Sequence, residues 1–365
     1  MLIDKRTSEK IRYLSVFAMV SVLLIHANNI ALVKNPKLWF VVFSDWFFTG
    51  IQMWAVPFFF MVSGFLFDKE FEVKKVSFLM IVKFWKKKIK SLLIPYLCWA
   101  IIGAVLTLPL FMSNNWIRQE NLFYRTIFAS ENIWSFFNHL FGICCGAPYG
   151  NGPLWYVRLL LLLLLFAPLI VVVRKTSKLL VFITAILLIL FFSPVNIASC
   201  SESFFNAFSI KIGGIGWFLL GMSINAFKLE KCVLSKTILY SCIITWIIIV
   251  GGYFYCDFWL FTILYRIAPL PLIIFLWFFI DVNNVNITNK KILIVSPFNF
   301  FIYCMHMPII ATVSALQRFL FGCTIYTALI ISVTSFLIVL FICTKLGEKI
   351  KMLYPRFFCV LNGGR

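Results

Sequence analysis

The stretch KIRYLSVFAMVSVLLIHANN, residues 10–29, indicates the class of fold to which this chain belongs. Basic residues lead into an apolar run that extends from Tyr13 to Leu32. A membrane-spanning helix needs about 20 mostly apolar residues, so this run is long enough to span. No A-x-A cleavage site follows it, and we therefore predict a retained first helix rather than a cleaved signal peptide.

The rest of the chain repeats this pattern. Of its 365 residues, 62% are hydrophobic, and the mean hydropathy is +0.98, which exceeds what a soluble fold requires. We predict an all-α fold, a polytopic transmembrane helix bundle of about ten spans that forms a single membrane domain over residues 1–365. The second span could begin earlier, because 38–50 is also apolar, or that stretch could lie in the interface as an amphipathic helix. The predicted spans are 13–32, 51–67, 92–112, 154–173, 179–193, 213–227, 237–253, 260–281, 294–316 and 323–343.

The distribution of charge predicts the orientation. The net charge of +20 would suggest a nucleic-acid partner in a soluble protein, but here 25 of the 33 Lys and Arg residues fall in segments on one side of the predicted membrane and six on the other. This bias predicts that the chain lies in a bacterial cytoplasmic (inner) membrane with both termini in the cytoplasm. It also argues against nucleic-acid binding. The basic run from Lys83 to Lys90 is interpreted as an orientation anchor that contacts anionic membrane lipids, with a docking patch for an anionic cofactor as the alternative.

Ionisable residues inside predicted spans are costly and point to function. His26, Arg158, Arg266 and His306 all map to the outer half of the membrane, so they could converge on one cavity. The alternatives are that Arg158 snorkels to the interface and that each His is a neutral, hydrogen-bonded structural residue. The span interiors contain no Asp or Glu, which argues against proton-coupled transport and suits an anionic substrate or an oxyanion.

The first helix carries a further pattern. Arg12 and Ser15 lie within about 40° and 20° of His26 around the helix axis, so all three share one stripe. Such a stripe suits an elongated anionic donor, with its phosphates near Arg12 and its reactive end near His26. Histidine is the usual general base for a sugar hydroxyl that attacks a thioester. The eleven Cys include no C-x-x-C pair, so we predict neither a metal site nor a disulfide framework.

Several segments together resemble the acyltransferase-3 family of integral-membrane acyltransferases, in the family's order and over nearly the whole chain. They are residues 10–29 ending near His26, VPFFFMVSGFLF at 56–67 with Ser63 and Gly64, the basic run leading into LLIPYLCW at 92–99, GPLWYVRLLLLLLLFAPLI at 152–170, and FFIYCMHMPII at 300–310.

The resemblance implies an acyltransferase that moves an acyl group, often acetyl, from acetyl-CoA or another acyl-CoA to a hydroxyl of an extracytoplasmic or lipid-linked glycan. It implies that His26 is catalytic and that the donor enters from the cytoplasm. The family's pattern is an Arg and a His separated by ten residues, and counted back from His26 the Arg position is Ser15 in this chain. We expect Arg12 to substitute for that Arg in donor binding. Candidates for the substrate pocket are Ser63, Arg158, Arg266 and His306.

The predicted outer segment 113–153 is interpreted as an amphipathic loop lying on the bilayer, with a platform for the acceptor as the other interpretation. Two other functions stay open. One is a transporter or flippase for an anionic lipid-linked substrate, with Arg158 and Arg266 as counter-charges. The other is a non-catalytic relative that binds a partner in a polysaccharide assembly complex.

Overall fold

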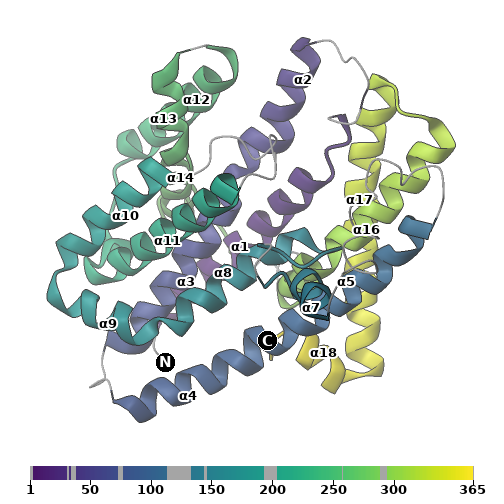
Figure 1. Cartoon of the computed structure of the whole chain (residues 1–365). Coiled ribbons are helices and arrows are strands. Elements are labelled where there is room, and N and C mark those ends of the chain that lie inside the picture. The colour runs from purple at the N-terminus through teal and green to yellow at the C-terminus, as the bar shows by residue number, and fades with distance from the viewer. Residues whose placement is uncertain are drawn as a thin grey trace. The chain divides into compact units, whose positions relative to one another are not determined.

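The computed structural model describes residues 3–30, 33, 38–72, 77–112, 133–143, 146–192, 204–256, 258–287 and 294–364. Within these ranges every regular element is a helix and there is no strand, as the sequence predicts (Figure 1). Residues 113–132 and 144–145 of the predicted outer segment lie outside the described residues. The chain divides into two compact units. The first unit comprises Met1–Val22, Val42–Ile81 and Leu163–Ser296, and the second comprises Leu23–Val41, Val82–Leu162 and Pro297–Arg365.

The first unit is organised around α11, which packs against α3 and α10, while α12 packs against α13 and α14. Helix α1, Lys5–His26, belongs to this unit up to Val22, and α2, Leu38–Ser44, enters it at Val42. The remaining elements are η2 Asp45–Gly50, η3 Ile51–Trp54, α3 Ala55–Glu72, α9 Ala167–Thr176, α10 Lys178–Phe192, α11 Phe204–Ala226, η6 Leu229–Lys231, α12 Lys236–Tyr255, α13 Trp259–Ile267 and α14 Pro269–Val282.

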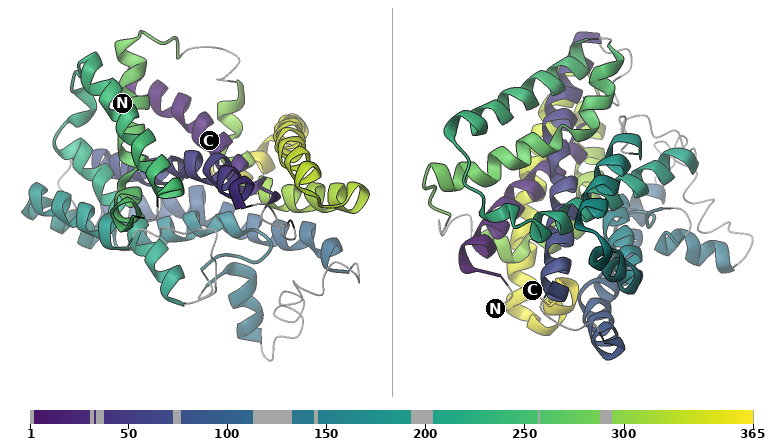
Figure 2. Two further views of the ribbon diagram at one scale, coloured as in Figure 1. Left: turned by 90° about the horizontal axis from the view of Figure 1, so that it is seen from above. Right: turned by 90° about the vertical axis from the view of Figure 1, so that its left-hand side faces the viewer.

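The second unit is built on α16, which packs against α17 and α5, with α18 closing against both α5 and α17. Helices α16 and α17 appear in yellow-green to yellow in Figures 1 and 2. Its elements are α4 Phe78–Lys88, which enters the unit at Val82, η4 Ile89–Leu93, α5 Ile94–Met112, α7 Ile133–Phe141, η5 Gly152–Leu154, α8 Trp155–Leu165, η7 Ser296–Phe298, α16 Asn299–Phe321, α17 Ile325–Leu353 and α18 Pro355–Leu361.

Each of the ten predicted spans overlaps a described helix, but the helices differ in length. Six helical runs in the described residues are long and apolar enough to cross a membrane, and a bent pair would make seven. One of the six, Trp39–Glu72, has 34 residues, which matches the longer alternative for the second span. A bend of 67° separates the two helices of the pair, Gly152–Leu165 and Pro168–Lys175. Pro168 lies at this bend: it has no backbone N–H to donate, and its ring clashes with the preceding helical turn.

Helix α1 ends at His26, earlier than the predicted limit of 32. Two asparagines redirect the backbone: the Asn28 side-chain oxygen accepts from the N–H of Ile30 at 3.1 Å, and the Asn29 amide donates to the carbonyl of Ala27 at 2.9 Å. Asparagine side chains compete in this way with helical hydrogen bonds and favour helix ends. His26 therefore occupies the last turn of α1.

Two glycines allow α3 and α11 to approach closely in the first unit. A Cβ on Gly64 would overlap the backbone carbonyl of Phe218, and a Cβ on Gly221 would overlap that of Met61. Small residues at helix crossings let backbones touch, which matters in hydrocarbon because apolar burial contributes little there. The Gly64 quoted in the sequence motif is thus a packing residue.

We predict that Gly64→Ala and Gly221→Ala each lower the free energy of unfolding by about 1–3 kcal/mol, because the two backbones must separate. Gly251→Ala in α12 is the matched control, since its Cβ would meet nothing within 4 Å. That variant should be neutral or more stable by up to about 1 kcal/mol. Thermal unfolding in detergent, followed by tryptophan fluorescence, measures all three, and equal stability of the three variants would contradict the packing argument.

Candidate functional site

Two histidines meet in the second unit. The ring centroids of His26, at the end of α1, and His306, in α16, lie 5.3 Å apart with the rings tilted by 44°. His306 is fully buried and His26 is half-buried. The sequence predicted similar depths for the two residues, and the structure brings them together. The pairing brings the imidazole rings of two helices that are distant in the sequence within contact distance.

Backbone hydrogen bonding fixes the tautomer of His306. Its Nδ1 lies 2.5 Å from the carbonyl oxygen of Tyr303, and because a carbonyl only accepts, Nδ1 must carry the hydrogen. The lone pair is therefore on Nε2, which is buried and has no hydrogen-bond partner among the described residues. His306 thus offers an acceptor nitrogen to a bound group or to a neighbouring donor.

Tyr303 supports this arrangement, and sequence reasoning did not single it out. Its hydroxyl donates to the carbonyl of Pro153, and its ring lies 5.9 Å from that of His306 and 6.1 Å from that of Tyr156. Tyr303 precedes His306 by three residues, the spacing that puts both on one face of a helix. That spacing was the signal in the sequence that could have found it.

Asn29 anchors the end of α1 to α16 and α17. Its backbone N–H donates to Ser332 Oγ at 2.9 Å, its side-chain amide donates to Ser314 Oγ at 3.3 Å, and its side-chain oxygen accepts from Arg318. Asn29 is only 3% exposed, so water cannot replace these partners. The position of His26, three residues earlier, depends on this buried network.

A second asparagine holds the turn of α16 that precedes His306. The buried Asn151 amide donates to the carbonyls of Cys304, at 2.8 Å, and Trp99, at 3.4 Å. The Trp99 indole in turn donates to the carbonyl of Leu361, and the side chain of Asn362 bonds the N–H of Phe301 and the carbonyl of Pro297. Helices α5, α16 and α18 are therefore joined by side chains that satisfy backbone groups.

The predicted donor-binding residues lie at the start of α1, in the first unit. Arg12 is exposed, and its Nε and Nη2 donate to Ser296 Oγ at 3.2 and 3.1 Å, while Ser15 lies half-buried about one turn further on. At the helix N-terminus the backbone N–H of Thr7 lowers the pKa of Asp4. Helix α1 is continuous from Lys5 to His26, as the shared stripe requires.

The remaining pocket candidates have other partners. Arg158 donates to the carbonyl oxygens of Ile143, at 2.5 Å, and Gly146, at 3.4 Å, which fixes the segment after α7 in the second unit. Arg266, in the first unit, donates to the carbonyls of Leu190 and Phe191 and so caps the C-terminus of α10. Ser63 is half-buried in α3 beside Gly64. Their roles in a substrate pocket stay predictions.

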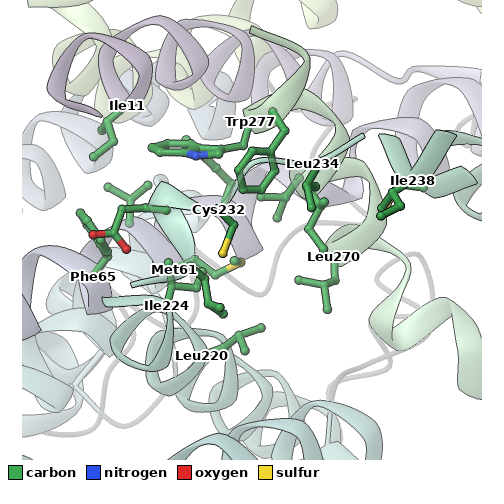
Figure 3. Close-up of a pocket in the computed structure, with 18 of the residues that line it drawn as sticks. Ile11, Met61, Phe65, Leu220, Ile224, Cys232, Leu234, Ile238, Leu270 and Trp277 are labelled. Atoms are coloured by element: carbon green, nitrogen blue, oxygen red, sulfur yellow. The ribbon is translucent and has the colours of Figure 1, made fainter. Parts of the chain in front are cut away.

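The first unit also contains a cavity of about 440 Å³. It lies among α3, α11, α12 and α14, and Figure 3 shows Met61, Leu220, Leu270 and Trp277 around it. The described residues contain no group of three or more His, Cys, Asp or Glu that could hold a metal ion.

An all-helical chain with several helices apolar enough to cross a bilayer defines a multi-pass membrane protein. Residues 9–344, nearly the whole chain, match the family described as "Acyltransferase domain", so the chain belongs to the acyltransferase-3 family. No curated protein and no solved structure gave a match. The family supports an acyltransferase and gives no support to the transporter hypothesis, whose two proposed counter-charges both bond backbone carbonyls.

We predict that Asn29→Ala lowers the free energy of unfolding by about 1–3 kcal/mol, because Arg318 and two serine hydroxyls lose a buried partner. Asn283→Ala is the control: its amide donates to the carbonyl of Phe279, but the contact is exposed, so the change should stay within about 0.5 kcal/mol. Thermal unfolding in detergent compares the two, and a loss no larger for Asn29→Ala than for Asn283→Ala would show that the network does not anchor α1.

Proposed function

We propose that this protein is a membrane O-acyltransferase that moves an acyl group, with acetyl as the expected one, from acyl-coenzyme A to a hydroxyl of an extracytoplasmic or lipid-linked glycan. The observation that carries the proposal is the His26–His306 pair, held at the end of α1 in a chain that belongs to an acyltransferase family. In this proposal the chain crosses a bacterial cytoplasmic membrane about ten times, with both termini in the cytoplasm, as its charge distribution predicts.

His26 is the proposed general base. Its imidazole removes the proton from the acceptor hydroxyl as the hydroxyl oxygen attacks the thioester carbonyl. A carbon–oxygen bond forms, the carbon–sulfur bond breaks, and the coenzyme A thiolate leaves and takes up the proton from His26. The products are the O-acylated glycan and coenzyme A, and the neutral imidazole is restored.

His306 is the proposed positioning residue for this step. With its hydrogen on Nδ1 held by Tyr303, His306 presents Nε2 as an acceptor beside the His26 ring. A hydrogen bond from His26 to that nitrogen would fix the orientation and tautomer of the base, as the third group does in many base-activated sites. The burial of His306 strengthens any such bond, because water does not compete for it.

Arg12 is the proposed contact for the phosphates of the donor. Its guanidinium is exposed, and in the hydrogen bonds described above Nε and Nη2 both donate to the hydroxyl of Ser296. The N–H groups of the planar guanidinium can therefore also face an anion. About 21 Å of helix rise separates Arg12 from His26, at 1.5 Å per residue. An extended coenzyme A suits that separation better than a compact donor does.

We predict that His26→Ala lowers acetyl transfer by at least about 100-fold, the usual contribution of a general base. Purified protein in nanodiscs is mixed with radiolabelled acetyl-coenzyme A and a panel of glycans, and both thioester loss and glycan labelling are followed. Asn283→Ala, an exposed change outside the proposed site, is the control and should match the wild type. Undiminished transfer by a folded His26→Ala protein would refute the assignment.

We predict that His306→Gln lowers kcat about tenfold and His306→Leu about 100-fold, with the KM for acetyl-coenzyme A nearly unchanged in both. Glutamine can still place an acceptor near the position of Nε2, whereas leucine of similar bulk cannot. Rates are expressed per folded protein after thermal unfolding of each variant. A purely structural His306 would instead give equal kcat values for the two variants once folding is taken into account.

A further inference from the structure

The cavity of the first unit has no part in the proposed acyl transfer, and its walls indicate a ligand of a different kind (Figure 3). We propose that it is a binding site for one hydrocarbon chain of a membrane phospholipid, whose head group lies against the basic segment that joins α11 to α12. This inference does not depend on the proposed catalytic role of His26.

The walls of the cavity are apolar. Helices α3, α11 and α14 supply Met61, Leu220 and Ile273, which are 4%, 3% and 6% exposed, and Trp277 stands over the cavity in Figure 3. The one carboxylate in the lining, Glu230, is itself buried: its Oε1 lies 3.4 Å from Lys69 Nζ, and its Oε2 has no hydrogen-bond partner among the described residues. The surface that is accessible from the cavity is apolar.

The apolar surface limits which molecules can occupy the cavity. Water is a poor occupant, because a buried water needs two or more polar partners. A polar ligand would give up its hydrogen bonds on entry without replacing them. An apolar cavity of about 150 Å³ already binds benzene, and this one holds about 440 Å³, enough for a considerably larger apolar group.

The charge beside the cavity supports a phospholipid in particular. The segment that joins α11 to α12 contributes Leu229, Cys232 and Leu234 to the lining, and Cys232 is exposed. Lys231 and Lys236, in the same segment, are exposed as well. Exposed lysines next to an apolar site match an amphiphile with a phosphate head and a hydrocarbon tail.

The test uses a phospholipid that carries a photoreactive diazirine on one acyl chain, incorporated into nanodiscs with the full-length protein. After irradiation, peptide mass spectrometry locates the adducts. We expect adducts on Met61 and Leu220, which face the cavity and are closed to lipid on the outer surface. Adducts on Ile244 and Ile247, which are 55% and 56% exposed on α12, report ordinary contact with the bilayer.

Filling the cavity should separate these two groups of adducts. Ile273→Trp should reduce the adducts on Met61 and Leu220 about tenfold, because the larger ring occupies the space of the chain. The adducts on Ile244 and Ile247 should not change. Ile244→Trp, on the exposed face of α12, is the matched control and should leave all the cavity adducts in place. If Ile273→Trp does not fold, Leu270→Phe supplies the smaller filling change.

Two further measurements test whether the hydrocarbon chain in the cavity belongs to a membrane phospholipid. Lys231→Glu combined with Lys236→Glu should reduce the cavity adducts if the phosphate lies beside these lysines. A photoreactive long-chain acyl-coenzyme A is the competing probe. Cavity adducts from that probe and none from the phospholipid would overturn the assignment to a membrane lipid. An absence of cavity adducts from both probes, or adducts that Ile273→Trp leaves unchanged in a folded protein, would overturn the site itself.

Discussion

Hydrocarbon offers no hydrogen-bond partners, and this constraint explains most of the polar contacts in the protein. Several of the polar side chains described above satisfy backbone groups or other buried side chains. Asn151 bonds the carbonyls of α5 and α16, Arg266 caps α10, and Arg158 holds the carbonyls that follow α7. In water such groups would have solvent as an alternative, whereas here an unmade bond costs the full desolvation penalty. In the second unit, Asn29 holds the chain that follows His26, and Asn151 holds the turn of α16 that precedes His306.

Packing in the first unit shows two opposite solutions to the same problem. Where α3 meets α11, Gly64 and Gly221 remove side chains so that the backbones touch. A short distance along α3, Met61 and Phe65 instead line an open volume. Apolar burial gives little advantage between helices that are already surrounded by lipid, so close packing matters where it forms and a lipid chain can fill what the side chains do not.

The proposed reaction places one nitrogen of the second unit, His306 Nε2, that has no hydrogen-bond partner among the described residues, beside the proposed base. The carbonyl of Tyr303 fixes the hydrogen of His306 on Nδ1, and this leaves Nε2 as an acceptor next to His26. Orphaned buried acceptors are tolerated where a ligand or a reacting group completes them. His26, the histidine that the sequence singled out, stands beside that acceptor.

The sequence by itself determined the helical membrane class and the acyltransferase family, and it singled out His26 and His306 as candidate site residues, because runs of apolar residues and ionisable groups within them are visible along a chain. A described helix overlaps each of the ten predicted stretches, while six helical runs in the described residues are long and apolar enough to cross a membrane. The sequence could not give the partners of Arg158 and Arg266, since a guanidinium in an apolar run serves a substrate or a carbonyl equally well until the neighbouring backbone is known. The roles of Asn29, Tyr303 and Gly221, and the cavity beside Met61, were likewise decided only by tertiary structure. Each depends on residues distant in the sequence, and no local pattern records which of them meet.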